Sequence, residues 1–327
     1  QRLVENRLEQ VIHKPFRQEL PLYRFRLIEM GEREYLLAFV IHHLIADGWS
    51  IGLLLQDIFN IYGELKNKRL SLVPAQFTYK DYIDLEQYHV TKEFVDRELE
   101  FWKKKLDGMP LSMNLPYDFK KDVDPEVGSQ KIYSFKAEMI DRLIEKSKET
   151  KTSLHIWFVS IYILLLYKLT EQDDVVIGLP VAGRNSSMLE KVVGPFINTI
   201  LMRVRFSNTN SFLELVDIVR NCSLEAYEHS ELPFEYLVNY LKHEMKIDNS
   251  DLYQVMFTFQ NYPMPKLKNI EPDLDCEAVY CDIKRAYNDL ALTIWDEQGD
   301  YKCSFEYRLS LWKESTIDRM FGYYIFL

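Results

Sequence analysis

Three consecutive segments between residues 35 and 65 constrain the fold more than any other part of the chain. Residues 35–41 read YLLAFVI, an apolar run of the length expected for a buried strand. A polar stretch containing a glycine follows at 42–50, and apolar residues then recur at helical spacing. These are Leu54, Ile58, Ile61 and Leu65. Residues 42–50 are therefore predicted to join a buried strand to an amphipathic helix.

Strands and helices are mixed along the rest of the chain. Apolar side chains alternate with arginines from Leu22 to Leu27, before a polar turn, which predicts a strand paired with 35–41. Helical patterns occur at 77–105, 139–149, 152–169, 212–228 and 234–243, and from Lys313 onward. Further strand patterns occur at 175–180, 253–259, 290–295 and 301–308. The fold class is therefore predicted to be mixed α/β (α+β).

The length of the chain, 327 residues with 47% hydrophobic side chains, is enough for two domains or one large two-lobed body. Residues 116–128 are rich in Asp and Pro and interrupt the helical pattern. The predicted lobes are therefore 1–130, which carries the 42–50 segment, and 131–327.

Charge and cysteine usage exclude several classes of function. The chain has 40 basic and 50 acidic residues, interspersed, so binding to nucleic-acid phosphates is not expected. The four cysteines form no CxxC pair, which predicts reduced thiols in a cytosolic (cytoplasmic) protein. The most apolar window, 154–169, is shorter than the ~20 residues that a bilayer requires. It is therefore predicted to be a buried core helix, with no membrane partner.

The most unusual segment is His42-His43-Leu44-Ile45-Ala46-Asp47-Gly48, which places two imidazoles and a carboxylate at a strand end. Adjacent residues at a strand end point to opposite faces, so one histidine can enter a cleft as a general base. In the alternative interpretation both histidines are satisfied core residues and Asp47 is a helix N-cap. A metal site is also conceivable, but the usual helical ligand spacing is missing, so none is predicted.

Covalent catalysis and nucleotide binding lack support. The chain has no GxSxG elbow, no cysteine in a recognisable reactive setting, no GxGxxG and no Walker loop. A site at the two histidines would therefore act directly between two bound substrates, without an acyl-enzyme.

These residues resemble the condensation domains of nonribosomal peptide synthetases, whose HHxxxDG motif is matched letter for letter at His42 to Gly48. Other segments resemble the family in the same order: PFRQELPLYR at 15–24, YKDYIDLEQ at 79–87 and FWKKKLDG at 101–108. IGLPVAGRNSSMLEKVVGPFINTILMR at 177–203, ELPFEYLV at 231–238 and YQVMFTFQN at 253–261 continue the similarity over almost the whole chain.

The resemblance implies a two-lobed fold similar to chloramphenicol acetyltransferase, with a V-shaped cleft. The floor loop would span about 182–199 and the latch about 261–287. In the family a further stretch precedes this region, so the chain is expected to be incomplete at its N-terminus.

The resemblance also assigns site residues. His43 would be the catalytic imidazole, His42 its inward-facing structural neighbour, and Asp47 a carboxylate paired with Arg184. Gly48 would let the backbone approach the reacting carbonyl closely. The residues expected to bind substrate are Trp49, Ser50, Asn198 and Asn261. For the two asparagines, a structural role in bonding the backbone is an equal alternative.

The implied function is amide-bond formation between a donor acyl or peptidyl thioester and the amine of an acceptor aminoacyl group. DGWSIGLL at 47–54 looks like the class that joins an L-donor to an L-acceptor. Both substrates would arrive on 4'-phosphopantetheine of upstream and downstream peptidyl carrier domains, beside an adenylation domain, with no cofactor bound by this domain itself. The alternatives are a stand-alone acyltransferase or epimerisation domain of the same fold, or a catalytically silent docking module.

Overall fold

The computed structural model describes residues 8, 11–16, 21–69, 74–110, 112–120, 127–206, 211–245, 253–262, 264–265, 274–279 and 281–327. The chain divides into two compact units, each built from three separate stretches. Unit 1 comprises Gln1–Leu85, Arg184–Ile197 and Tyr262–Ile283, and unit 2 comprises Glu86–Gly183, Asn198–Asn261 and Lys284–Leu327. This division differs from the predicted lobes in two ways: residues 86–130 belong to the second unit, and residues 184–197 and 262–283 belong to the first. The lobe boundary at residue 130 therefore stays a prediction.

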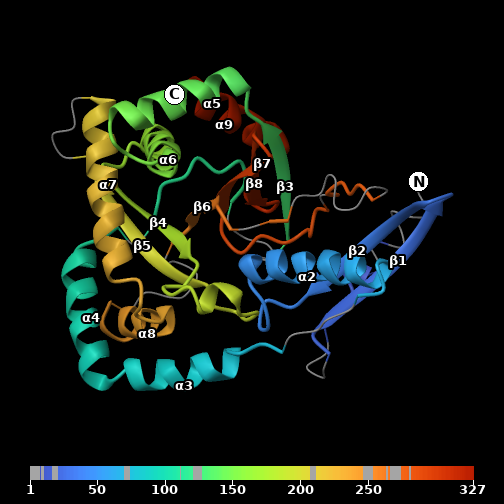
Figure 1. Cartoon of the computed structure of the whole chain (residues 1–327). Helices are drawn as coiled ribbons and strands as arrows, with labels where there is room; N and C mark the ends of the chain where they lie inside the picture. Colours follow the sequence, from blue (N-terminus) through green and yellow to red (C-terminus); the bar gives the residue numbers. More distant parts are fainter. Residues whose placement is uncertain are drawn as a thin grey trace. The chain divides into compact units, whose positions relative to one another are not determined.

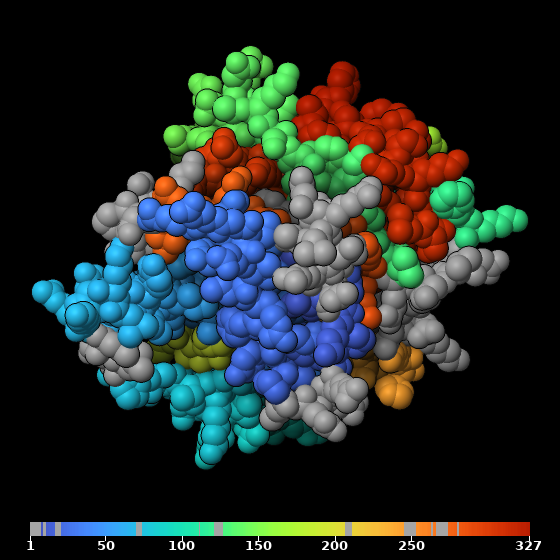
Figure 2. All heavy atoms as spheres, turned by 90° about the vertical axis from the view of Figure 1, so that its right-hand side faces the viewer, coloured from blue at the N-terminus to red at the C-terminus, as the bar shows by residue number. Residues whose placement is uncertain are grey.

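Unit 1 contains the predicted strand pair and the helix after it. Strand β1 (Tyr23–Gly31) pairs antiparallel with β2 (Glu34–Ile41), so that Tyr23 lies opposite Ile41. Helix α2 (Gly48–Lys66) follows β2 after a short turn, as the sequence predicts. The expectation that residues 35–41 form a buried strand is wrong, because Ala38 is the one buried residue of β2. The hairpin forms part of the molecular surface in Figure 2, where it is blue. Several of its apolar side chains are exposed, namely Tyr23, Phe25, Leu27, Tyr35 and Leu37.

Unit 2 is built on a six-stranded mixed sheet in the order β3-β8-β7-β6-β4-β5 (Figure 1). Pairing of β4 with β6 and of β6 with β7 is parallel, and the other pairs are antiparallel. The strands are β3 (Gly128–Ser134), β4 (Asp174–Val181), β5 (Asn198–Arg205), β6 (Val255–Gln260), β7 (Leu290–Glu297) and β8 (Asp300–Arg308). The four strands predicted from the sequence in this region are confirmed, and β3 and β5 are additional.

Helix α6 (Leu154–Thr170) forms the centre of the core of unit 2. It contacts β4 and β6, and α5 (Ala137–Glu149), α7 (Phe212–Glu228) and α9 (Glu314–Phe326) pack around it (Figure 1). Ser153 caps its N-terminus by accepting a hydrogen bond from the N–H of Ile156. Most of its residues are buried, because apolar side chains occur all around it. The predicted core helix is therefore confirmed.

Among the described residues, no single helix is long and apolar enough to cross a bilayer, and only α5 and α6 together, bent by 106°, meet those criteria.

The segment predicted as one helix at 77–105 consists of two, which corrects that expectation. Helix α3 (Tyr79–His89) ends before Val90, and α4 (Lys92–Leu106) begins after Thr91. The hydroxyl of Thr91 accepts a hydrogen bond from the N–H of Phe94, so Thr91 is an N-cap. Its side chain satisfies a free N–H of the second helix, and a new helix starts where the sequence pattern suggested continuity. Helix α8 (Phe234–Met245) also lies where the sequence predicts it.

The β7–β8 hairpin shows how local sequence sets local structure. Its two-residue turn is formed by Gln298 and Gly299, whose φ angles are 60° and 100°. Positive φ at both positions matches the twist of the flanking strands, and glycine adopts it without steric cost. Asp296 adds a hydrogen bond by accepting the N–H of Gly299 at 2.6 Å.

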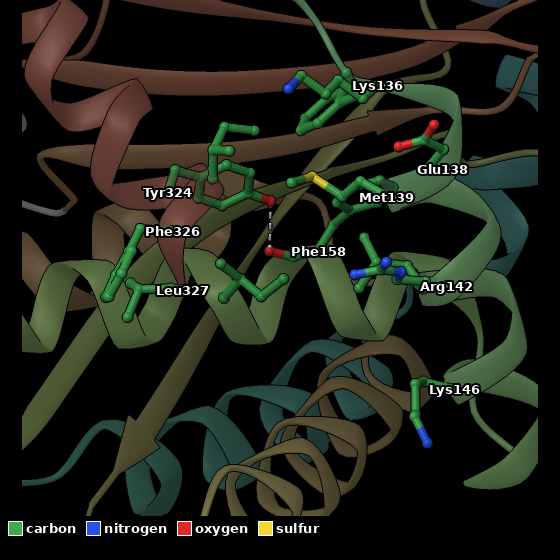
Figure 3. A pocket seen from close by; sticks show the side chains of 13 residues that line it. Lys136, Glu138, Met139, Arg142, Lys146, Phe158, Tyr324, Phe326 and Leu327 are labelled. Carbon is green, nitrogen blue, oxygen red and sulfur yellow. Dashed lines mark hydrogen bonds between the residues drawn. The ribbon is translucent and has the colours of Figure 1, made fainter.

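A cavity of about 310 Å³ lies in unit 2 where α5 and α6 meet the end of α9 (Figure 3). Its wall includes Met139, Arg142 and Tyr324, and the hydroxyl of Tyr324 donates to the carbonyl oxygen of Phe158 at 2.9 Å. None of the predicted site residues is among those that line it.

Candidate active site

The two histidines lie in a tight turn between β2 and α2, and hydrogen bonds of the described residues hold the side chain of His42 in it. The N–H of His42 donates to the carbonyl oxygen of Leu22 at 2.9 Å. Its Nδ1 accepts the N–H of Leu44 at 3.1 Å, which requires Nδ1 to be unprotonated. The ring of Phe16 meets the imidazole edge-on at 5.6 Å. The imidazole of His42 is therefore part of the turn, whereas His43 is exposed.

Asp47 directly precedes α2 and is the centre of a hydrogen-bond network inside unit 1. Its Oδ1 accepts the N–H of Ser50 at 2.8 Å, which makes Asp47 the N-cap of the helix. Its Oδ2 accepts the N–H of Phe196 at 3.1 Å. The N-cap alternative raised from the sequence is confirmed by this geometry, and the same carboxylate also pairs with a cation.

That cation is Arg184, whose Nη2 donates to Oδ1 and Oδ2 of Asp47 at 3.0 and 3.2 Å. The side chains are 1% and 3% exposed, for Arg184 and Asp47 respectively. Burial lowers the pKa of Arg184 from its ordinary value, and the carboxylate of Asp47 opposes that shift. Arginine keeps its charge under such conditions because its ordinary pKa is so high. A buried charge of this kind is stable only with its partner in place.

The same guanidinium orders the segment that follows β4. Its Nη1 donates to the carbonyl oxygens of Leu189 and Val192 at 2.6 and 2.7 Å. These two residues lie within and directly after a short 3₁₀ helix (Leu189–Lys191). The ring of Phe196 lies against the guanidinium, with its centre 4.1 Å from Cζ. One side chain thus holds the stretch Arg184–Ile197 to the start of α2.

Trp49 and Ser50, both predicted to bind substrate, take part in this network through their polar groups. The indole N–H of Trp49 donates to the carbonyl oxygen of Glu190 at 2.9 Å. The hydroxyl of Ser50 donates to the carbonyl oxygen of Gly194 at 2.9 Å and accepts its N–H at 3.0 Å. It also accepts Nη2 of Arg184 at 3.0 Å. The hydroxyl of Ser50 is thereby fully engaged within the protein, and substrate binding by these two residues stays a prediction.

The two candidate asparagines belong to unit 2. Asn198 begins β5, and its Nδ2 donates to the carbonyl oxygens of Ser230 and Leu232 at 2.8 and 2.7 Å. Its Oδ1 accepts the N–H of Phe234 at 3.0 Å. These bonds support the alternative that Asn198 secures the turn before α8. Asn261 follows β6 and is exposed. A substrate-binding role for either residue stays a prediction.

The predicted floor loop and latch are described to different extents. Residues 182–197 connect β4 to β5, and Arg184–Ile197 belongs to unit 1. Of the latch at 261–287, residues 263, 266–273 and 280 lie outside the described part of the chain.

Sequence reasoning missed Tyr262 and Tyr79, two aromatic side chains packed against glycines of the network. A Cβ at Gly48 would lie 3.0 Å from a ring carbon of Tyr262, and one at Gly194 would lie 2.2 Å from a ring carbon of Tyr79. Gly48 is itself a signal in the sequence, since it belongs to the motif, whereas Gly194 adjoins no candidate residue. Their partners are far away in the chain and only the fold identifies them.

The part of the chain that the structure describes contains no cluster of three or more His, Cys, Asp or Glu able to hold an ion. All four cysteines are free of disulfides. Burial raises the pKa of Cys303 and of Cys222, which keeps both thiols protonated. Within the motif at 42–48, the exposed side chains are those of His43 and Leu44.

Comparison with known proteins identifies the family. The model of the condensation domain family matches residues 1–327. A linear gramicidin synthase from Brevibacillus parabrevis is 34% identical over 315 residues, 93% of this chain but 6% of the relative's own length.

Two solved structures support the fold. A four-domain nonribosomal peptide synthetase, AB3403, matches with a TM-score of 0.79 and 23% identity over 98% of this chain and 26% of that chain. The complex of the X-domain and OxyB from teicoplanin biosynthesis matches with a TM-score of 0.82 and 20% identity, over 99% of this chain and 73% of that chain. The chain belongs to the condensation domain family.

Proposed function

We propose that this chain forms an amide bond between a donor acyl or peptidyl thioester and the amine of an acceptor aminoacyl group. Both substrates would be carried on 4'-phosphopantetheine arms of peptidyl carrier domains. The observation that carries the proposal is the anchored turn from His42 to Asp47. One imidazole is fixed by the turn, Asp47 is tied to Arg184, and the imidazole of His43 is left exposed.

Attack of an amine on a thioester requires few catalytic groups from the protein, because the thioester is already activated. The amine nitrogen attacks the thioester carbonyl, the new C–N bond forms, the C–S bond breaks, and the amine proton is transferred to the departing thiolate. An α-amine with a pKa near ~7.7 to 8.0 is partly unprotonated at neutral pH. Holding the amine against the thioester can supply ~7 to 11 kcal/mol of the barrier. His43 would add general-base or hydrogen-bonding help, typically ~10² to 10⁴-fold.

The finer assignments rest on the family resemblance. The segment DGWSIGLL at 47–54 supports an L-donor and an L-acceptor. The relatives are peptide synthases, which supports upstream and downstream carrier domains and an adjacent adenylation domain as partners. Two lobes divided near residue 130, a floor loop at 182–199, a latch at 261–287 and a cytosolic location belong to the same proposal.

A docking module is the second candidate function, and one observation favours it. A structural relative, the X-domain, forms a complex with OxyB. A fold of this kind can therefore serve as a binding partner for another protein. The intact pair of Asp47 and Arg184 beside an exposed imidazole favours the enzyme, because a docking surface does not need a buried ion pair behind it.

The experiment compares the full-length protein with its His43→Ala variant. A donor carrier loaded with an acyl group and an acceptor carrier loaded with an aminoacyl group are mixed, and intact mass detects the amide product on the acceptor. His243→Ala is the matched control, because His243 is also exposed but lies on α8. Product that is lost only in His43→Ala supports the proposal. No product across a panel of loaded donors, with both carriers still bound, favours the docking module.

A further inference from the structure

Tyr262 lies against the first residue of α2, close to the proposed catalytic turn. A Cβ added at Gly48 would lie 3.0 Å from Cε1, 3.1 Å from Cζ and 3.4 Å from the hydroxyl oxygen of Tyr262. The phenol ring therefore occupies the space into which a side chain at position 48 would project. Gly48 directly follows Asp47 and is the first residue of the helix.

The backbone does not require glycine at position 48. The described glycines with positive φ are Gly108, Gly183 and Gly299, and Gly48 is not among them. An L-residue could therefore adopt the conformation of Gly48 without strain. Glycine is also a poor helix former, about 1 kcal/mol less favourable than alanine within a helix. The requirement at this position is thus for space, and the ring of Tyr262 fills that space.

The same arrangement recurs on the other side of the network. A Cβ at Gly194 would lie 2.2 Å from Cδ2 of Tyr79, and the φ of Gly194 is likewise not positive. The hydroxyl of Tyr79 donates to the carbonyl oxygen of Pro195 at 3.3 Å, which fixes the ring in place. The N–H and the carbonyl of Gly194 both bond Ser50, two residues after Gly48. Tyr262 therefore contacts the first turn of α2 at Gly48. Ser50, in the same turn, is bonded to Gly194, against which Tyr79 packs.

We propose that Tyr262 is a positioning residue for the turn that carries His43. Its ring sets the place of Gly48, and Gly48 sets the place of Asp47 and of the His42–Ala46 turn before it. In this view glycine is needed at position 48 to receive Tyr262, rather than to admit a substrate. The expected effect of Tyr262 on the rate of amide formation rests on the proposed function. Its expected effect on the stability of the protein rests on packing alone.

The two explanations for Gly48 predict opposite results when Tyr262 is shortened. If the ring is the neighbour that position 48 must accommodate, Gly48→Ala pushes the ring and the turn apart by a few tenths of an ångström. Removing the ring then relieves the new methyl group. If a bound substrate approaches position 48 instead, the methyl group blocks the substrate whatever residue occupies position 262.

The experiment is a double-mutant cycle in the full-length protein, using Gly48→Ala, Tyr262→Ala and both together. Tyr262→Phe keeps the ring, and Tyr62→Ala, which removes an exposed tyrosine on α2, is the matched control. The measurements are kcat and KM for the aminoacyl acceptor carrier and the thermal unfolding midpoint. We expect each alanine variant to lower kcat about tenfold with KM within twofold, since the turn is displaced but carrier binding is not.

In the double variant, kcat is expected to exceed the product of the two single effects by at least about fivefold. Tyr262→Phe and Tyr62→Ala should keep wild-type kcat. A double variant as slow as, or slower than, the multiplied single effects would overturn the inference. If the wild-type protein makes no amide, the proposed function fails. The thermal unfolding midpoints of the variants then test the packing of Tyr262 against Gly48 by themselves. Coupling between positions 48 and 262 would uphold the packing relationship, and independent effects would overturn it.

Discussion

Asp47 and Arg184 are 137 residues apart in the chain, and their side chains meet at 3.0 Å with almost no exposure to solvent. The carboxylate also caps α2, and the guanidinium also bonds two carbonyl groups of the segment after β4. One ion pair therefore connects the start of a helix to a long loop and holds the turn that bears His43.

Arg184→Ala should lower stability and activity together. The substitution leaves Asp47 buried without its cation, and loss of one partner of a buried pair costs about 3–5 kcal/mol. Chemical denaturation measures the free energy of unfolding, and amide formation measures activity. Arg220→Ala is the control, because Arg220 is partly exposed and pairs with Asp217 of the same helix. A fully stable Arg184→Ala protein that has lost only activity would contradict a structural role for the pair.

Ser50→Ala should destabilise unit 1 although it removes a single oxygen atom. The N–H of Gly194 and one donor of Arg184 lose their buried acceptor, and each unsatisfied group costs about 1–3 kcal/mol. The free energy of unfolding is again the measurement. Ser134→Ala, at an exposed position that ends β3, should change it by less than about 0.5 kcal/mol. Equal stabilities of the two variants would rule out the network described for Ser50.

Asn198→Ala separates the structural role of this residue from a role in binding substrate. The variant leaves the carbonyls of Ser230 and Leu232 and the N–H of Phe234 without their partner. We expect a loss of about 1–3 kcal/mol in the free energy of unfolding. Asn198→Asp should be as harmful, because a carboxylate cannot donate to two carbonyl oxygens. Unchanged stability with a raised KM for either carrier would instead favour substrate binding.

The stability of the protein should rise between about pH 4 and pH 6.5 through His155 on α6. Burial against Phe257 and Phe259 lowers the pKa of His155 to about 4, whereas the unfolded chain retains about 6.5. Between these values the unfolded state binds the additional proton. The contribution is therefore complete above pH 6.5 and is lost as the pH falls toward 4, by up to about 3 kcal/mol.

Unfolding free energies measured at intervals of pH test this expectation. His155→Leu should flatten the profile between pH 4 and 6.5, because it keeps an apolar side chain against the strand and removes the titrating group. His243→Leu, at an exposed position on α8, should leave the slope unchanged. A slope in His155→Leu as steep as in the wild type would show that other groups cause the pH dependence.

Periodicity in the sequence predicts most of the helices and strands, because the side chains of most elements follow a regular pattern of apolar and polar residues. Helix α6 has apolar side chains on all its faces, and β7 and β8 are joined by a turn that glycine identifies. The break between α3 and α4 could not be predicted from periodicity, because the helical pattern continues across it and one threonine hydroxyl makes the difference. Strand β3 was missed because it follows an irregular stretch rich in Asp and Pro, which obscures its start.

The candidate site could likewise be predicted only in part. The motif at 42–48 locates the turn, the N-cap and, through the family resemblance, the partner Arg184. The engagement of Ser50 by Gly194 and the ring of Tyr262 against Gly48 depend on distant segments of the chain. Local sequence patterns do not indicate which distant segment will pack against a residue, so such contacts are identified only from the folded structure.

The interleaving of the two units has a consequence for recombination between related chains. Unit 1 takes its residues from three stretches, of which the second follows β4 and precedes β5 in the chain. A chimera with a single crossover between residues 85 and 184 would combine Asp47 from one parent with Arg184 from the other. The start of α2 and the loop at 184–197 would then come from different parents and would not be matched to each other. Viable hybrids should therefore exchange residues 184–197 together with residues 1–85.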